Sequence, residues 1–451
     1  MVETTETIVA IATPPGRGAI GIVRVSGPLV KNIIAGLIQS SLQPRVSTFC
    51  KYYDENSLII DEGLAIFFPA PSSFTGEDVL EVYTHGSRAV LELIVKNITR
   101  LGAKLARPGE FTERAFHNNK LDLVQAEAVA ALIDATSEQA VRSAVRSLEG
   151  EFSGRVNILL KELIKIRVYV ESMLDFPEEE TDLKDKKQIN EKLQHCLTVL
   201  EDIRTRAKQG AVLKEGATAV IIGKPNAGKS TLLNKLAGRD TAIVTEIPGT
   251  TRDLIAEDIQ LEGVPLHIID TAGLRSTRNK IEQEGIRRAR DTAELADIVI
   301  LVRELDHKPD KEEQKIVDSI NPGKPLVILN NKIDLFNVEP EIQHTNDSRT
   351  AIFLSAKTGE GIDLLVSHLK NILGVKEMYE DVFMARSRHL DALERVRQSL
   401  HNAICSVNRG TITELLAEDL RVSQQALGEI TGEFASDDLL GEIFSTFCIG
   451  K

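Results

Sequence analysis

The middle of the chain carries the stretch Gly223-Lys224-Pro225-Asn226-Ala227-Gly228-Lys229-Ser230. It fits the pattern G-x-x-x-x-G-K-S/T, which is the loop that holds the phosphates of a nucleotide. Residues 217–222 before it are apolar and β-branched enough for a buried strand, and residues 231–236 are typical of a helix start. In this context the glycines let backbone N–H groups turn toward phosphates, and the helix N-terminus adds partial positive charge. We therefore expect Lys229 to reach the β- and γ-phosphates and the Ser230 hydroxyl to bind Mg²⁺.

Three motifs downstream, each after a strand-like run, argue against a chance match in a glycine-rich turn. Asp270-Thr271-Ala272-Gly273 offers a carboxylate that can hold Mg²⁺ through water and a glycine N–H for the γ-phosphate. Asn331-Lys332-Ile333-Asp334 ends in a carboxylate that can accept both N–H donors of the guanine edge, an arrangement that adenine does not offer. Ser355-Ala356-Lys357 matches the loop that contacts the guanine carbonyl. In this order the motifs form the G-protein set, so we expect a GTP-binding α/β domain.

Composition and charge are those of an ordinary globular protein. The 451 residues predict two to four domains, and the contents of 42% hydrophobic and 27% charged residues are typical of soluble chains. Trp is absent and aromatic residues make up 4%, which argues against an aromatic platform for stacking nucleic-acid bases. The net charge of −13 argues against RNA binding over the whole surface, but it allows a local basic patch or RNA bound through a partner.

The spacing of the cysteines and the N-terminal residues indicate in which cellular compartment the protein works. The four cysteines lie far apart without metal-binding spacing, which predicts free thiols in a reducing cytoplasm. The acidic start, residues 1–6, does not fit a signal peptide, and no apolar run approaches the length of a membrane span. We therefore expect a cytoplasmic protein.

Changes in residue composition and apolar periodicity along the chain predict four segments: 1–118, 119–212, 213–378 and 379–451. The first is mixed α/β, with strand-like runs at 7–12, 19–25, 63–68 and 79–84. The second and fourth are helical by apolar periodicity, with one helix expected over 183–209, and Gly150 and Gly154 are candidate breaks. The simplest architecture inserts the GTP-binding segment 213–378 into one helical domain built from both flanks. Two separate helical segments are the alternative.

The segment after the phosphate loop narrows the class of GTPase. Pro248-Gly249-Thr250-Thr251-Arg252-Asp253 resembles switch I of the TrmE–Era–EngA–septin-like GTPases. Leu274 stands where Ras-like proteins carry the glutamine that orients the attacking water, and a leucine cannot do this. The chain therefore resembles a hydrophobic-substituted GTPase that takes its catalytic group from elsewhere.

Three further stretches carry a resemblance over the whole chain. Residues 14–20 (Pro-Pro-Gly-Arg-Gly-Ala-Ile), residues 119–127 (Asn-Lys-Leu-Asp-Leu-Val-Gln-Ala-Glu) and the tail Phe447-Cys448-Ile449-Gly450-Lys451 resemble the MnmE (TrmE) family of tRNA-modification GTPases. The resemblance implies an α/β and α fold: an N-terminal α/β tetrahydrofolate-binding and dimerisation domain (1–118), a discontinuous helical domain, and an inserted Ras-like P-loop GTPase domain.

The resemblance also implies a reaction and partners. Members of the family form homodimers and join the flavoprotein MnmG (GidA) in a heterotetramer. Together they attach an aminomethyl or carboxymethylaminomethyl group to carbon 5 of the wobble uridine of tRNA. The carbon comes from a tetrahydrofolate derivative (5-formyl- or 5,10-methylene-tetrahydrofolate). The alternative is a regulatory GTPase switch in ribosome assembly, but such a switch needs neither a folate-like domain nor this tail.

The resemblance places folate contacts on Arg24, Glu81, Lys120 and Lys451. Basic side chains can meet the glutamate tail of a folate, and a carboxylate can take the paired N–H donors of the pterin. Simple surface charges are the alternative for each residue. The resemblance also gives Cys448 a role in the modification, and a small buried apolar side chain is its alternative.

For GTP hydrolysis the family uses K⁺ as a positive charge at the phosphates and a switch II glutamate to orient water. The match to residues 281–286 places this glutamate at Glu282, with Glu284 as the rival and a solvated helix charge as the alternative for either. Glu282 is expected to reach the site when the two GTP-binding domains of a dimer meet. K⁺ would lie at Asn226, Thr245, Ile247 and Thr250, and Mg²⁺ at Ser230 and Thr251.

The predicted GTP-binding residues come from five short segments. They are Asn226, Ala227, Gly228, Lys229, Ser230, Thr231, Thr245, Glu246, Ile247, Pro248, Gly249, Thr250, Thr251, Asp270, Thr271, Ala272, Gly273, Asn331, Lys332, Asp334, Ser355, Ala356 and Lys357.

Overall fold

The computed structural model divides the chain into two compact units. The first comprises Met1–Ile133, Ser147–Leu200 and Ala392–Lys451, and the second comprises Asp134–Arg146 and Glu201–Asp391. Among the residues that the structure describes, no helix combines the length and the apolar character needed to cross a membrane. The described residues are 6–175, 183–237, 256–261, 264–270, 296–306, 314, 317–318, 320–321, 323–344, 349–374, 382–409, 414–434 and 436–450.

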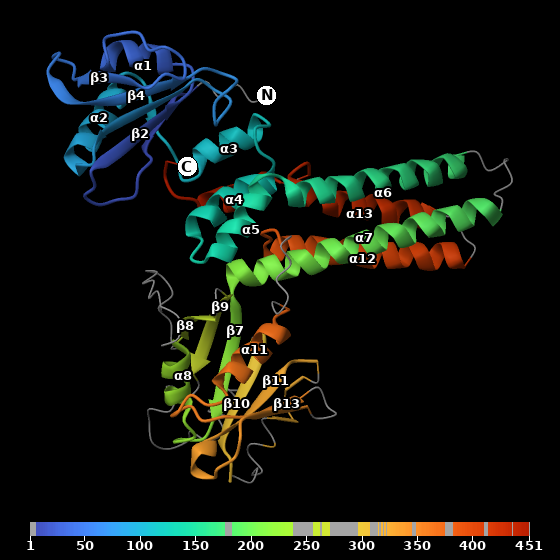
Figure 1. Cartoon of the computed structure of the whole chain (residues 1–451). Coiled ribbons are helices and arrows are strands. Elements are labelled where there is room, and N and C mark those ends of the chain that lie inside the picture. The colour runs from blue at the N-terminus through green and yellow to red at the C-terminus, as the bar shows by residue number, and fades with distance from the viewer. Residues whose placement is uncertain are drawn as a thin grey trace, which may run out of the picture. The chain divides into compact units, whose positions relative to one another are not determined.

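A six-stranded sheet organises the N-terminal part of the first unit, in the order β3-β4-β5-β2-β1-β6. All neighbours pair antiparallel except β1 and β6, which are parallel. Helices α1 (Val30–Leu37) and α2 (Arg88–Arg100) bury their apolar stripes with the sheet in one core (Figure 1). The strands are β1 (Ile8–Ile11), β2 (Ile20–Ser26), β3 (Thr48–Tyr53), β4 (Ile59–Phe68), β5 (Val79–His85) and β6 (Lys104–Leu105).

Helices from both flanks of the GTP-binding segment share a core in the first unit. The long helix α6 packs side by side with α13 (Figure 1), although their contacting residues Arg167 and Gln424 are 257 positions apart in the chain. Buried leucines and isoleucines recur along both helices at the helical period. The flanking helices are α3 (Glu110–His117), α4 (Leu123–Asp134), α5 (Glu138–Leu148), α6 (Glu151–Asp175), α7 (Leu183–Glu215), α12 (Ser387–Asn408), α13 (Glu414–Thr431) and α14 (Asp437–Ser445).

A seven-stranded sheet forms the centre of the second unit, in the order β12-β13-β11-β10-β7-β9-β8. Its five inner strands are parallel, and the two edge strands are antiparallel to their neighbours. The inner strands are nearly all apolar because both faces of the sheet are covered by separate cores. The elements are β7 (Ala217–Gly223), α8 (Lys229–Ala237), β8 (Ala256–Leu261), β9 (Val264–Asp270), β10 (Ile298–Glu304), β11 (Leu326–Asn331), the 3₁₀ turn η2 (Ile333–Leu335), β12 (Glu341–His344), β13 (Arg349–Phe353) and α11 (Ile362–Ile372).

The fold class predicted from the sequence is confirmed, including the discontinuous helical domain and the inserted P-loop domain. The four strands expected in the N-terminal segment are β1, β2, β4 and β5, while β3 and β6 were not expected. The bounds of the four predicted segments stay predictions.

One helix end was predicted wrongly. The sequence predicts a helix over 183–209, but α7 continues to Glu215. Gly210 lies inside it, where an added Cβ would come within 1.9 Å of the Phe383 carbonyl oxygen. This glycine therefore permits a close backbone contact and does not end the helix. Similarly, Gly150 separates α5 from α6, whereas Gly154 lies within α6.

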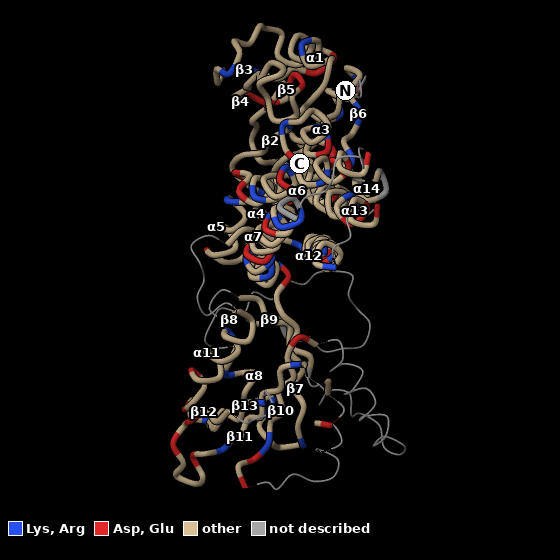
Figure 2. Tube along the Cα trace, turned by 90° about the vertical axis from the view of Figure 1, so that its right-hand side faces the viewer, with Lys and Arg blue, Asp and Glu red and all other residues tan. Residues whose placement is uncertain are grey.

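Charged residues of both signs are interspersed along α6, α7 and α12 (Figure 2). Several pair within one helical turn, such as Arg206 with Asp202 and Arg397 with Glu394. Such partly exposed pairs contribute little to stability individually. They do show that much of the basic charge on these helices already has an acidic neighbour.

Candidate functional site

The phosphate loop lies between the end of β7 and the start of α8, at the carboxyl edge of the parallel sheet. Because β7 has β9 on one side and β10 on the other, the loop lies where the strand order reverses, which is where α/β sheets bind ligands. Asn226 adopts a positive φ of 66° and Gly228 one of 100°. A Cβ on Gly228 would lie 2.2 Å from Nδ2 of Asn331, so only glycine fits this turn.

Asn331 joins the three motif loops. Its Nδ2 donates to the carbonyl oxygen of Ala227 at 2.8 Å, and its Oδ1 accepts from the backbone N–H of Ala356 at 2.9 Å. The side chain is buried, with only 3% of the residue exposed. One amide therefore satisfies a donor and an acceptor of two different loops, which fixes the phosphate loop against the two base-recognition loops.

Lys229 and Asp334 mark the two ends of the site. The Nζ of Lys229 donates to the carbonyl oxygens of Gly223 and Lys224, both at 2.8 Å, so its ammonium lies within the phosphate loop. At the other end, the Ser355 hydroxyl donates to Oδ1 of Asp334 at 2.6 Å, and this orients the carboxylate. Phosphate and base would thus meet opposite charges at opposite ends.

These loops enclose a cavity of about 600 Å³, within the range of small-molecule and cofactor sites. Eleven of the residues predicted to bind GTP line this cavity, and they come from the phosphate loop and both base-recognition motifs. Sequence reasoning missed Pro225 and Leu335, although both lie inside or beside the quoted motifs. The lining residues are Pro225, Asn226, Gly228, Lys229, Ser230, Thr231, Asn331, Lys332, Asp334, Leu335, Ser355, Ala356 and Lys357.

Most of the residues predicted for catalysis and for the cations lie outside the described residues. For Asp270 the structure describes the backbone, which ends β9 opposite Ile221 of β7. Asn226 and Ser230 line the cavity and present oxygen donors, which suit hard cations such as K⁺ and Mg²⁺. Outside the described residues lie Thr245, Glu246, Ile247, Pro248, Gly249, Thr250, Thr251, Thr271, Ala272, Gly273, Leu274, Glu282, Glu284 and Lys451.

A second polar cluster lies on the six-stranded sheet, around Arg24 of β2 and Glu81 of β5, which are register partners. The Arg24 Nη2 is 2.9 Å from Oε1 of Glu81, and the Tyr83 hydroxyl donates to Oε2 of Glu81 at 2.8 Å. Burial and the hydrogen bond to Glu81 raise the pKa of Tyr83 to about 12, so this hydroxyl remains a donor at neutral pH. The Arg24 guanidinium also lies 5.6 Å from the ring centroid of Phe74.

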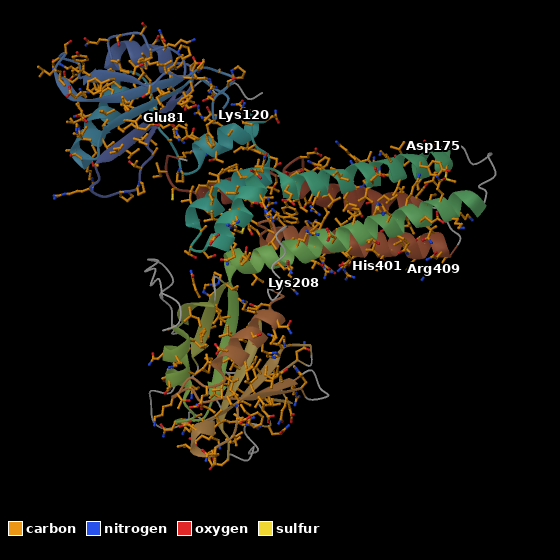
Figure 3. All side chains as sticks on the ribbon, viewed as in Figure 1. Glu81, Lys120, Asp175, Lys208, His401 and Arg409 are labelled. Atoms are coloured by element: carbon orange, nitrogen blue, oxygen red, sulfur yellow. The ribbon has the colours of Figure 1, made fainter. Side chains whose placement is uncertain are left out.

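The family resemblance named Arg24 and Glu81, which the structure brings together, but it did not name Tyr83 or Phe74 beside them. The alternation of side chains along β5 puts residues 81 and 83 on one face, which was the available signal. Lys120, labelled with Glu81 in Figure 3, follows α3 and donates from Nζ to the Pro71 carbonyl oxygen at 3.1 Å.

The C-terminal tail lies against this same domain. Arg24 Nη1 is 3.5 Å from the Gly450 carbonyl oxygen, and the Gly109 N–H is 3.5 Å from the carbonyl oxygen of Cys448. Cys448 is exposed, so its alternative interpretation as a small buried apolar residue is wrong. The tail therefore brings an accessible thiol to the domain that carries Arg24 and Glu81.

Comparisons with known proteins cover the whole chain. A model of the MnmE helical domain matches residues 123–448, and a model described as the GTP-binding protein TrmE N-terminus matches residues 7–120. Three proteins, each called tRNA modification GTPase MnmE, are among the similar relatives. The protein of Hydrogenovibrio crunogenus is 49% identical over 449 residues, covering 100% of this chain and 99% of the relative. Those of Coxiella burnetii and Legionella pneumophila are each 51% identical, over 450 and 452 residues, covering 99% of both chains.

Proposed function

Because this chain belongs to the MnmE (TrmE) family of tRNA modification GTPases, we propose that it hydrolyses GTP as part of a system that modifies tRNA. The observation that carries the GTPase part is the cavity between three loops joined by Asn331, with Lys229 at one end and Asp334 at the other. Nucleoside analysis of tRNA from cells with and without the protein tests the whole proposal. Unchanged nucleosides, together with a ribosome-assembly defect, would favour the alternative of a regulatory switch.

The finer chemistry follows the family. We propose that the chain works with the flavoprotein MnmG in the cytoplasm to add a (carboxymethyl)aminomethyl group to carbon 5 of the wobble uridine, using a carbon from tetrahydrofolate. The cluster around Arg24 and Glu81 supports a folate site, because it pairs a guanidinium with a carboxylate beside the aromatic ring of Phe74. The nearby exposed Cys448 supports a role for this thiol in the modification.

A prediction for the folate site uses Arg24→Ala. We expect folate affinity to fall by roughly 10- to 100-fold, the effect of losing one hydrogen bond that involves a charged group. GTP turnover should stay near normal, because the GTP cavity belongs to a different sheet. Titration calorimetry with 5-formyl-tetrahydrofolate measures the affinity, and Lys120→Ala should also weaken binding.

The matched control is Arg88→Ala. Arg88 is an exposed arginine on α2 that pairs with Glu92 within its own helix. We expect it to leave folate affinity unchanged. If the wild-type protein binds no folate, the folate proposal is wrong, whatever the variants do.

The proposed homodimer is supported by the face of the six-stranded sheet that lies opposite α1 and α2. That face carries Phe49 and Leu64, which are cross-strand partners and are 66% and 43% exposed. Neighbouring apolar side chains left in water are typical of an interaction surface. Sedimentation of the purified protein as a monomer would contradict the dimer.

GTP hydrolysis needs a positive charge at the phosphates and a group that orients or deprotonates the water. Asn226 offers an amide oxygen at the cavity, and we propose that K⁺ binds there together with Thr245, Ile247 and Thr250 of switch I. When bound, K⁺ stabilises negative charge that develops on the phosphates, as Mg²⁺ does from Ser230 and Thr251. We propose that Glu282 orients or deprotonates the water that attacks the γ-phosphate.

We expect Glu282→Ala to lower GTP turnover by about 100-fold, which is typical of removing one acid–base group, while GTP still binds. We expect faster hydrolysis by the wild-type protein in K⁺ than in Na⁺, and Asn226→Ala should remove this difference. Steady-state phosphate release measures both effects.

Glu284→Ala is the matched control, because it removes a neighbouring carboxylate from the same segment. A fully active Glu282→Ala protein would move the role to Glu284 or elsewhere. Equal rates in the two salts would contradict the K⁺ proposal without affecting the assignment of Glu282.

A further inference from the structure

We propose that Glu304 is a positioning residue for the guanine end of the GTP cavity and that it acts through Lys332. The inference rests on the proposed GTP-binding function and adds to it a residue outside the G-protein motifs. Glu304 is the last residue of β10, and its register partner on β11 is Asn331, the residue that joins the motif loops.

The contact is an ion pair between the last residue of β10 and the loop that follows its neighbour β11. The Nζ of Lys332 donates to Oε1 of Glu304. Lys332 has a positive φ of 70°, and it precedes the short turn η2 that carries Asp334. Lys332 lines the cavity, whereas Glu304 does not. The carboxylate therefore holds the lysine from outside the cavity.

The pairing completes a pattern at the base end of the site. Asp334 is oriented by the Ser355 hydroxyl, which in turn accepts the backbone N–H of Thr358 at 3.2 Å. Glu304 does the same for Lys332 with the opposite sign of charge. Asp334 and Lys332 thus each have a protein partner that fixes the direction of the side chain.

The expected effect is on binding and not on the stability of the fold. The side chains of Lys332 and Glu304 are 31% and 39% exposed, so solvent weakens their attraction and the pair stabilises the fold little. A lysine side chain has many rotamers, however, and restricting them before a ligand enters lowers the entropy cost of binding. Competition between Glu304 and the nucleotide for Lys332 would have the opposite sign, because removing Glu304 would then tighten binding.

The test uses the full-length protein with Glu304→Gln, which keeps the shape and removes the charge. We expect Kd to rise by about two- to fivefold for both GTP and GDP, the size typical of a partly exposed ion pair. We expect kcat at saturating GTP to stay the same, because Glu304 is not among the residues that line the cavity. Glu341→Gln is the control, since it removes an exposed carboxylate from β12 of the same sheet.

A double-mutant cycle shows whether Glu304 acts through Lys332. In a Lys332→Met background, Glu304→Gln should cause no further loss of affinity. An equal loss in both backgrounds would overturn the inference, as would unchanged or tighter binding by Glu304→Gln alone. A wild-type protein that binds no guanine nucleotide would overturn the proposed function together with this inference, so the two failures are distinguishable.

Discussion

The Asp334→Asn variant should lose affinity for GTP and gain affinity for xanthosine triphosphate. The carboxylate can accept two N–H donors of guanine, whereas an amide offers one acceptor and one donor, which matches xanthine. Each hydrogen bond to a charged group contributes roughly 1.5–3 kcal/mol. The amide loses one of the two bonds outright and the negative charge behind the other, so GTP affinity should fall by roughly 100- to 1,000-fold. Competition of each nucleotide against a fluorescent GDP measures the change.

The structure adds a reason for expecting this variant to fold. Ser355 donates its hydroxyl to Oδ1 of Asp334, and the side-chain oxygen of an asparagine can accept the same bond. The exchange should therefore alter base specificity more than stability. Asp363→Asn, an exposed aspartate on α11, is the control. If Asp334→Asn keeps wild-type affinity for GTP, the assignment of the guanine-reading residue is wrong.

Asn331→Asp should lower the affinity for GTP and for GDP alike, by about 1,000-fold. The amide of Asn331 donates to the Ala227 carbonyl oxygen, and a carboxylate has no donor for it. Each buried polar group left without a partner costs about 1–3 kcal/mol, and a buried negative charge next to a carbonyl oxygen adds to this. The phosphate loop then loses its fixed position relative to the base-recognition loops.

The neighbouring residue provides a matched control for the same exchange. Asn330 is as buried as Asn331, at 4% against 3% exposed, but its Oδ1 accepts from Nε of Arg303 at 2.7 Å. Asn330→Asp keeps that acceptor and places its charge beside a guanidinium, so nucleotide affinity should change little. Equal losses from both variants would show that the affinity responds to a general disturbance of β11 and not to the Asn331 bonds.

The sequence alone determined the class of fold and which loops meet at one cavity. The reason is that the phosphate loop and the base-recognition motifs are local: each is a short loop directly after an apolar strand, and the strand, loop and turn form from adjacent residues. Parallel strands then bring such loops to one edge of the sheet, whatever the details of packing. For this reason eleven predicted residues line one cavity.

Contacts between distant residues were decided only by the tertiary structure. No local pattern shows that Gly210 must leave room for the Phe383 carbonyl, which is why the end of α7 was predicted wrongly. Local sequence patterns also do not show that α6 packs on α13, that Tyr83 orients Glu81, or that Glu304 holds Lys332. Such contacts depend on register and packing between strands and helices far apart in the chain, and sequence periodicity specifies only which face of each element is buried.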